Sequence, residues 1–283
     1  MLCTAKEILK AARKSRYAVP GFNCVADIMI RGILDRAELC RAPVFVMVYV
    51  TEIDEKTWWY YPTTIRSVAE RYTIPIVLHL DHATEIDIIK SALDNGFTSV
   101  MYDGSHHPFD ENAAVTRMVV ELAVPYGASV EAELGLVGGF GLERTNSTAN
   151  ILTQPDEVER FVERTGVDSL AVSIGTSHGV YPQLPQLDIA LLKELDAASK
   201  VPLVLHGGSG TPDEQVRAAV ENGICKINVY TDLRIAMWRR FKKIAAETKR
   251  DDPLPNDYIG QMQEAIGDLV ETKITLAGTA GKA

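Results

Sequence analysis

The sequence predicts an α/β fold, a single (β/α)8 barrel with an extra C-terminal helical segment, on three observations. Eight short apolar runs are present, amphipathic stretches separate them, and most of the runs end in polar residues. Continuously apolar runs are typical of parallel strands that are buried on both faces. The expected strands are residues 17–23, 43–50, 74–80, 97–103, 128–134, 168–174, 201–206 and 224–230.

The repeated strand–helix units continue without a change of composition, which favours one barrel domain over residues 1–283. A doubly wound open sheet is the alternative fold. Eight runs with polar residues at nearly every carboxyl end favour the barrel, because a barrel collects the carboxyl ends of its strands at one rim.

Helices are expected between the apolar runs, for example over residues 26–39, 85–94 and 211–223. Thr84 should cap the second of these helices, and Pro212 should lie in the first turn of the third. The second and third both end in an Asn-Gly pair, which suits a helix C-terminus.

Two segments interrupt the regular alternation. Residues 138–155 are rich in Gly and Thr and too long for a simple connection, so we expect either a functional lid or a disordered loop. Residues 251–257 separate the last barrel helix from the rest of a C-terminal helical extension, residues 251–283. The end of that extension, residues 276–283, is expected to fray.

Bulk properties exclude several classes of partner. A net charge of −9 argues against a nucleic-acid partner, because binding phosphates along a duplex needs clustered Lys and Arg. No apolar run approaches the ~20 residues that a membrane span needs, and the N-terminus lacks the apolar core of a signal peptide. Cys3, Cys24, Cys40 and Cys225 form no CxxC pair, so reduced thiols and a cytoplasmic location are expected.

Three histidines follow three different predicted strands, and they are His82, His178 and His206. Each alone could be a satisfied polar residue of the core. In a barrel, however, all three would meet at the rim that carries active sites. Three imidazoles with no fourth protein ligand indicate a catalytic zinc site with an open position, holding one ion per subunit.

Asp81 directly precedes the first of these histidines. Neighbours on a regular strand point to opposite faces, but at a strand end the chain is already turning, so both Asp81 and His82 could face the site. Beside a divalent cation, the carboxylate could transfer a proton or orient an imidazole.

A glycine-rich turn follows the seventh strand and consists of Gly207, Gly208 and Ser209. Asn228 and Thr231 occupy the corresponding place after the eighth strand. Many barrels bind phosphate at these two strand ends, where glycine lets the backbone approach closely and hydroxyls donate hydrogen bonds. A metal, a carboxylate and a phosphate-binding turn together indicate an enzyme that acts on a phosphorylated small molecule.

Glu131 and Glu133 lie two residues apart and therefore on one face of their strand. They could bind a second metal, orient a histidine or stabilise the barrel interior. Asn23, Tyr49 and Asp103 complete the ring of polar residues expected at the strand ends.

Long segments of the chain resemble the class II (zinc-dependent) fructose/tagatose-bisphosphate aldolases. They include "YAVPGFN", "LHLDHATEIDIIKSALDNGFTSVMYDGSHHPFDENAA", "VDSLAVSIGTSHGVY", "PLVLHGGSG" and "GICKINVYTDLR", and they run from about residue 17 to 234. Within this family, the chain most resembles the tagatose-bisphosphate aldolases in its length and in the sequence of these segments.

The resemblance implies reversible aldol cleavage of a ketose phosphate to dihydroxyacetone phosphate and an aldehyde, in carbohydrate metabolism such as glycolysis. It also implies a homodimer or homotetramer, and a monovalent cation could assist. The zinc ligands would be His82, His178 and His206, and Asp81 would be the proton donor. Asp103 and Glu133 would belong to an alternative metal site. The expected substrate contacts are Asn23, Gly179, Gly207, Gly208, Ser209, Asn228 and Thr231.

Four positions depart from the family pattern, and the departures cluster around the distal end of the substrate. Tyr49 replaces a small hydroxyl residue and Gly260 replaces an arginine, both of which serve the distal phosphate in relatives that cleave bisphosphates. Pro182 and Tyr230 replace a lysine and an aspartate. The aldehyde product could therefore be unphosphorylated or simply different, which makes cleavage of a ketose 1-phosphate the alternative reaction.

Ordinary drift in an authentic bisphosphate aldolase is an equally good reading of these departures. Arg144, Arg239 or Arg240 could supply a new cation for the distal phosphate. Glu143 corresponds only approximately to the acid of the family's mobile loop. The acidic, Trp-rich residues 52–61 could form an interface, a substrate rim or part of the core.

Two competing functions remain less favoured. A zinc hydrolase on a barrel usually begins with an H-x-H pair on its first strand, and residues 17–23 contain no histidine. A non-catalytic relative that acts as a sugar sensor or stabilising subunit should have lost a metal ligand or the acid, whereas all of them are present.

Overall fold

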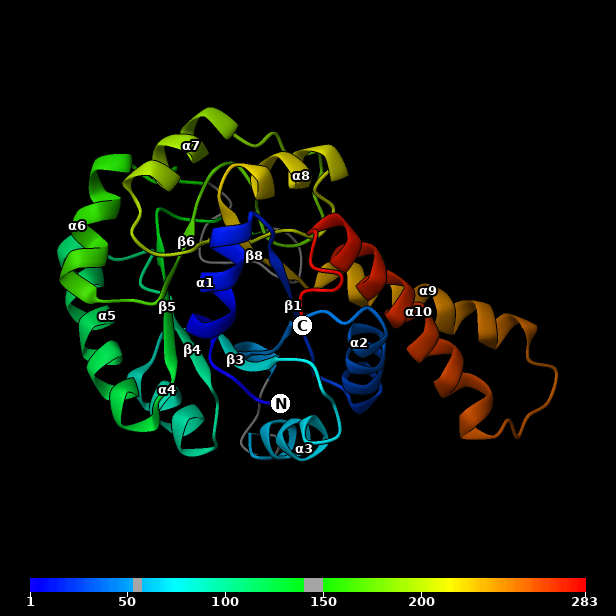
Figure 1. Cartoon of the computed structure of the whole chain (residues 1–283). Helices are drawn as coiled ribbons and strands as arrows, with labels where there is room; N and C mark the ends of the chain where they lie inside the picture. The colour runs from blue at the N-terminus through cyan, green and yellow to red at the C-terminus, as the bar shows by residue number, and fades with distance from the viewer. Residues whose placement is uncertain (53–57, 140–149) are drawn as a thin grey trace.

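The structure is a computed structural model of the chain, and it describes residues 1–52, 58–139 and 150–283. Eight parallel strands close into a barrel in sequential order, because β1 pairs with both β2 and β8 (Figure 1). The strands are β1 Val19–Asn23, β2 Val44–Tyr49, β3 Ile76–Ala83, β4 Ser99–Tyr102, β5 Ser129–Leu134, β6 Ser169–Val172, β7 Leu203–Leu205 and β8 Ile224–Val229. The predicted α/β barrel is confirmed, and closure excludes the open sheet.

Helices surround the barrel on all sides (Figure 1). They are α1 Ala5–Ser15, α2 Asp27–Leu39, α3 Tyr60–Ala69, α4 Ile86–Asp94, α5 Phe109–Ala123, α6 Pro155–Thr165, α7 Ile189–Ala198, α8 Asp213–Glu221, α9 Thr231–Glu247 and α10 Pro255–Leu276. The main core lies between these helices and the outward-facing strand residues. A smaller core forms where α1 packs Ile8 and Leu9 against Val19, Phe45 and Val77, so α1 covers the amino end of the barrel.

The helix C-termini lie where the sequence predicts them, but the N-termini do not. Gly96 and Gly223 follow α4 and α8 with φ angles of +82° and +127°, which glycine adopts without strain. The N-cap of α4 is Glu85 rather than Thr84, since Thr84 lies on the wall of a cavity. Pro212 is the N-cap of α8, with an extended ψ of 139°, and therefore precedes the first turn.

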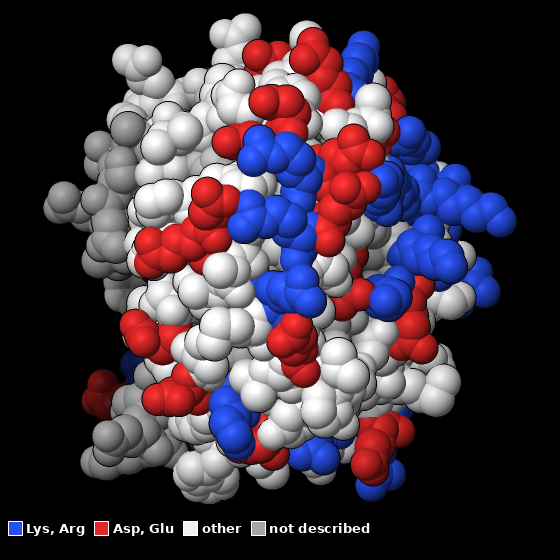
Figure 2. All heavy atoms as spheres, turned by 90° about the vertical axis from the view of Figure 1, so that its left-hand side faces the viewer, with Lys and Arg blue, Asp and Glu red and all other residues white. Residues whose placement is uncertain are grey.

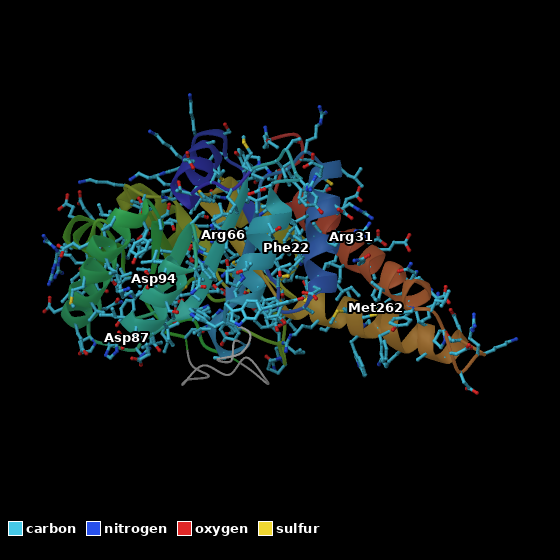
Figure 3. All side chains as sticks on the ribbon, turned by 90° about the horizontal axis from the view of Figure 1, so that it is seen from below. Phe22, Arg31, Arg66, Asp87, Asp94 and Met262 are labelled. Carbon is cyan, nitrogen blue, oxygen red and sulfur yellow. The ribbon has the colours of Figure 1, made fainter. Side chains whose placement is uncertain are left out.

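The extra C-terminal segment is present as α10, which packs against α2 and α9. Figure 1 shows α9 and α10 extending together beyond the barrel, and Figure 3 shows Met262 on the part of α10 that projects. No helix within the described ranges is long and apolar enough to cross a membrane.

The C-terminal end is hydrogen-bonded rather than frayed, so that expectation is wrong. Thr279 is fully buried, and its hydroxyl donates to the carbonyl of Ala18 just before β1. The amide of Gly281 donates to the carbonyl of Cys40 at 3.0 Å, and that of Ala283 donates to Arg41 at 2.9 Å. The end of the chain thereby joins the segments that enter β1 and β2.

Charged side chains on the outer helices form pairs. The face over α5 and α6 shows acidic and basic side chains next to each other (Figure 2). Lys200 lies 2.6 Å from Glu163, and Arg164 pairs with Asp110. All four cysteines are free thiols, as expected.

Candidate active site at the carboxyl end of the barrel

A cavity of about 340 Å³ opens at the carboxyl ends of the strands. Most of the residues singled out from the sequence line this cavity, and they are Asn23, Tyr49, Asp81, His82, Asp103, His178, Gly179, Gly207, Ser209, Asn228 and Tyr230. Leu136 and Val137 supply an apolar part of the wall. The topology therefore brings together residues that lie up to about 200 positions apart.

Asp81 and His82 both line the cavity although they are neighbours at the end of β3. His82 has a φ of +56°, in the left-handed region that few residues other than glycine adopt. The pairing of β3 with β4 shifts register between Leu80 and Ala83. This local turn rotates one side chain relative to the other, so that both reach the same space.

The three histidines form a compact group. The centroid of the His82 ring lies 4.8 Å from that of His178 and 4.6 Å from that of His206. Within the described ranges, no hydrogen-bond partner exists for Nε2 of His82 or for either nitrogen of His178, and Nδ1 of His206 makes no hydrogen bond of acceptable geometry although a carboxylate oxygen lies 3.0 Å away. Unpartnered nitrogens in a buried group are costly, and one ligand atom from each ring lies within 4.8 Å of the others. This arrangement could hold a metal ion.

Carboxylates hold the opposite nitrogens of two of these rings. Nδ1 of His82 lies 2.8 Å from Oδ2 of Asp103, whose other oxygen accepts a 2.6 Å hydrogen bond from the Ser105 hydroxyl. Nε2 of His206 lies 3.1 Å from Oε1 of Glu131. Such contacts fix the ring orientation and leave the remaining nitrogen for a metal.

Glu133 lies on the other side of His206. Its Oε2 is 3.0 Å from Nδ1 of that ring, and its Oε1 accepts a 3.0 Å hydrogen bond from the amide of Val137. Glu133, Asp103 and His82 form a second group that could hold a metal ion.

The electrostatics of the group favour positive charge at His82. Burial lowers the pKa of His82, but the negative charges of Asp81 and Asp103 raise it by more, so that the pKa is about 10. Burial and the neighbouring imidazoles instead lower the pKa of His178 well below its usual value. The carboxylates around His82 are therefore arranged to stabilise a cation.

Two asparagine amides hold Asp81. Nδ2 of Asn23 donates to Oδ2 at 2.8 Å, and Nδ2 of Asn228 donates to Oδ1 at 3.0 Å. Burial raises the pKa of Asp81, but the positive charges of His82 and Lys226 outweigh it, and the pKa lies below its usual value. A carboxylate with both oxygens fixed lies beside the imidazole cluster.

The turn after β7 depends on glycine. Gly207 has a φ of +68°, and a Cβ at this position would lie 2.4 Å from the carbonyl oxygen of Ser177. Gly179 also lines the cavity, with a φ of +88°. The hydroxyl of Ser209 accepts 3.2 Å hydrogen bonds from the amides of Tyr230 and Asp232 and so connects the turn to the start of α9.

Gly208 and Thr231 lie behind this wall and are not among the described residues that line the cavity. The amide of Gly208 donates to the carbonyl of Asn228 at 3.1 Å. Thr231 is the buried first residue of α9.

Sequence reasoning missed several cavity residues, namely Val50, Thr51, Thr84, Ser105, His106, Leu136 and Val137. Ser105 and His106 follow Asp103 directly in the loop after β4. Their position just past a predicted strand end was the available signal.

Several residues proposed for the distal phosphate or for the rim are not at the cavity. Arg239 and Arg240 belong to α9, where Arg240 pairs with Glu264 of α10 at 3.3 Å. In the Trp-rich segment, Trp58 stacks on Phe97 with 6.1 Å between ring centroids, as a core residue does, whereas Trp59 is exposed.

Glu143 and Arg144 lie outside the described residues, as do residues 53–57 and most of the 138–155 loop. Gly260 lies in α10, where a side chain would meet open space.

Comparisons with known proteins agree with this geometry. The profile of the family described as fructose-bisphosphate aldolase class-II matches residues 3–282. A fructose-bisphosphate aldolase of Giardia intestinalis is 38% identical and aligns with 100% of this chain and 94% of its own length.

Solved structures show the same likeness. The YdjI aldolase of Escherichia coli K12 is 34% identical, with a TM-score of 0.89 and full coverage of both chains. A putative fructose-1,6-bisphosphate aldolase of Coccidioides immitis is 31% identical, with a TM-score of 0.88 over 98% of this chain and 97% of its own. This chain belongs to the class II fructose-bisphosphate aldolase family and is a metal-dependent aldolase, as its sequence motifs indicate.

Proposed function

We propose that this aldolase uses zinc to cleave a ketose phosphate reversibly to dihydroxyacetone phosphate and an aldehyde, as on fructose or tagatose 1,6-bisphosphate. The observation that carries the proposal is the convergence of unpartnered nitrogens of three imidazoles beside a fixed carboxylate. The whole chain, residues 1–283, would act as one catalytic domain.

His82, His178 and His206 would hold the zinc. The bound ion would supply Lewis-acid stabilisation of the negative charge that develops as the C3–C4 bond breaks. Asp103 and Glu131 orient two of these rings through their outer nitrogens. Glu133 and Asp103, with His82, would form the alternative metal position.

Asp81 would move the proton. In cleavage it accepts the proton of the C4 hydroxyl, the O–H electrons form the aldehyde C=O, and the C3–C4 electron pair stays on C3. In condensation it returns the proton to the nascent hydroxyl. Asn23 and Asn228 keep the carboxylate in one orientation for both directions.

The phosphate of dihydroxyacetone phosphate would bind at the glycine turn. Gly179, Gly207 and Ser209 line the cavity there, and the N-terminus of the 17-residue helix α9 is hydrogen-bonded to the turn through Ser209. Gly208 and Thr231 would shape this site through the backbone behind it. A monovalent cation at the phosphate remains a prediction.

A specific observation favours a ketose 1-phosphate as the alternative substrate. None of the cavity-lining residues in the described ranges is Lys or Arg. Tyr49 and Tyr230, whose ring centroids lie 6.4 Å apart, line the wall instead. Phosphate recognition favours cations or several backbone amides, so an uncharged, hydroxylated aldehyde suits this wall better than a second phosphate.

The test is release of dihydroxyacetone phosphate from fructose 1,6-bisphosphate, tagatose 1,6-bisphosphate and the corresponding ketose 1-phosphates, with and without a chelator. Chelator-sensitive cleavage restored by zinc supports the proposal. Cleavage that favours a bisphosphate many-fold would reject the ketose 1-phosphate alternative, and cleavage of monophosphates alone would reject a distal phosphate site. If none of the substrates were cleaved, the result would support a non-catalytic relative instead.

We also propose a cytoplasmic homodimer or homotetramer. The α9–α10 pair, which projects from the barrel, carries Trp238 and Phe241, with side chains 56% and 41% exposed and rings stacked at 5.5 Å. Exposed aromatic pairs are common in interfaces. Light scattering on the wild type and on Trp238→Ala would test this assembly, and a monomeric wild type would contradict it.

A further inference from the structure

A buried ion pair crosses the interior of the barrel beneath the cavity. Nζ of Lys226, on β8, lies 2.9 Å from Oε1 and 2.8 Å from Oε2 of Glu131, on β5. Both side chains are completely buried, at 0% exposure. Barrel interiors are usually filled by branched aliphatic residues, and burying two charges costs more than their attraction returns unless further hydrogen bonds compensate.

Neutral groups fix the lysine end of this pair. Nζ of Lys226 lies 3.4 Å from Nε2 of His79 and 5.1 Å from the centroid of the Phe45 ring. Burial and the charge of Lys226 lower the pKa of His79 to about 3, so the neutral ring accepts a hydrogen bond from the ammonium. Its Nδ1 then donates to the Ser99 hydroxyl at 2.8 Å. The ammonium therefore has a defined position.

The carboxylate end of the pair reaches a histidine of the site. Oε1 of Glu131 lies 3.1 Å from Nε2 of His206, and Oε2 accepts a 3.3 Å hydrogen bond from the Ser169 hydroxyl. A carboxylate only accepts hydrogen bonds, so this contact places the imidazole proton on Nε2. Nδ1 of His206 is thereby left with its lone pair, and its contact with Oε2 of Glu133 does not have the geometry of a hydrogen bond.

A second carboxylate competes for the proton of His206, so another group is needed to keep that proton on Nε2. Oε2 of Glu133 lies 3.0 Å from Nδ1 of His206 and would attract the same proton to the wrong nitrogen. Glu131 opposes it from the other side of the ring. Lys226 holds both oxygens of Glu131, so the carboxylate cannot rotate away from Nε2.

We propose that Glu131 and Lys226 form a positioning pair, in which Lys226 fixes Glu131 and Glu131 holds His206 with Nδ1 free for the metal. The proposal rests on the zinc-dependent function proposed above. Neither residue is among the described residues that line the cavity, so the pair acts through His206 and not on the substrate.

Two readouts on the metal-free protein test the proposal. The first is the zinc dissociation constant, from competition with a chromophoric chelator. The second is the free energy of unfolding in urea. A structural role would change only the second readout, whereas a positioning role changes the first.

The decisive variant replaces both charges, as Glu131→Leu with Lys226→Met. Apolar residues of similar volume often replace a buried ion pair with little loss of stability. His206, His79 and Ser169 each lose a buried partner here, however, so the urea midpoint of the metal-free protein should fall while the protein stays folded. Its zinc affinity should fall by about 10- to 100-fold, as for other residues that orient metal-binding histidines. The same exchange at the exposed pair, Glu163→Leu with Lys200→Met, is the control and should leave zinc affinity unchanged.

A double variant with wild-type zinc affinity would overturn the proposal, and a lower urea midpoint with unchanged zinc affinity would leave the pair a purely structural one. Should the double variant fail to fold, Glu131→Gln keeps the volume but replaces the carboxylate by a neutral, weaker acceptor, so zinc affinity should fall several-fold but less than in the double variant. Unchanged zinc affinity in that variant also counts against positioning. A wild type that takes up no zinc would overturn the proposed function itself, and the role of the pair with it.

Discussion

At the scale of single residues, the backbone of His82 decides what the site contains. On a regular strand, Asp81 and His82 would face opposite sides of the barrel wall. The φ of +56° at His82 brings both side chains into the cavity, at a cost of roughly 1–2 kcal/mol for a residue with a Cβ. The sequence predicts that Asp81 and His82 lie at a strand end. It does not predict the left-handed backbone, because His does not favour that conformation.

Glu131 shows why some roles cannot be predicted from the sequence. The two-residue spacing places Glu131 and Glu133 on one strand face, which leaves metal binding, histidine orientation and interior packing open. The choice depends on Lys226, which lies 95 positions further along the chain and reaches Glu131 only across the closed barrel. No short-range sequence pattern predicts a contact between residues so far apart in the chain.

Asp81→Asn tests the proton-transfer role. The amide keeps the shape of the side chain, and Asn23 and Asn228 can turn their own amides to match it, because their Oδ1 atoms have no partner among the described residues. We expect kcat for dihydroxyacetone phosphate release to fall by about 10²- to 10⁴-fold, with zinc content unchanged.

Asp87→Asn, on the exposed side of α4 (Figure 3), is the matched control and should behave as the wild type. Near-normal turnover by Asp81→Asn would remove Asp81 from the mechanism.

At the scale of elements, strands are predicted more faithfully than helix starts. A buried parallel strand shows itself as a continuous apolar run, and all eight strands lie within the predicted ranges or overlap them. The residue at which a helix starts depends on one backbone angle. A residue that could cap the helix can instead line the neighbouring cavity. Thr84 lines the cavity instead of capping α4, and Pro212 precedes α8 rather than entering it.

Glycine at two positions makes a contrasting pair of variants. Gly207→Ala should lower the free energy of unfolding by about 2 kcal/mol or more, because a left-handed residue with a Cβ is strained and the Cβ would meet the Ser177 carbonyl at 2.4 Å. Affinity for dihydroxyacetone phosphate should fall as well, since this turn lines the cavity.

Gly260→Ala should instead add about 0.5–1 kcal/mol, because Gly260 lies in the interior of α10 and its Cβ would meet open space. Urea unfolding and substrate titration of both variants check these expectations. A Gly207→Ala protein as stable and active as Gly260→Ala would show that the turn tolerates a side chain.

The segment after α10 offers another stability test. Thr279→Val removes the buried hydroxyl that donates to the Ala18 carbonyl and should cost about 1–2 kcal/mol. Thr272→Val removes an exposed hydroxyl on α10 and should stay within about 0.5 kcal/mol of the wild type. Equal urea midpoints for the two variants would mean that the C-terminal contacts contribute little to stability.

At the scale of the whole molecule, the barrel joins residues from β1, β2, β3 and β8, and from the loops that follow β4, β5, β6 and β7, in one cavity. This gathering could be predicted because strand ends of a closed barrel share a rim. The surroundings of the distal end could not be predicted, since Tyr49 and Tyr230 approach each other only when β2 and β8 flank β1.

Metal binding should therefore stabilise the entire fold. Zinc at a free concentration of 100 times its dissociation constant should add about 2.7 kcal/mol to the free energy of unfolding, because it binds only the assembled histidines. Tm measured by calorimetry should rise with zinc in the wild type and much less in His178→Ala. The same rise in both proteins would place the zinc elsewhere.

The two ends of the chain bear on how the enzyme can be handled. The amino group of Met1 donates to the carbonyls of Tyr72 and Ile74, just before β3, and the amide of Ala283 donates to Arg41, just before β2. Both contacts lie at the amino end of the barrel, whereas the cavity opens at the carboxyl end. A tether at Met1 or Ala283 would therefore attach the enzyme to a resin or an electrode with the opening of the cavity facing the solution.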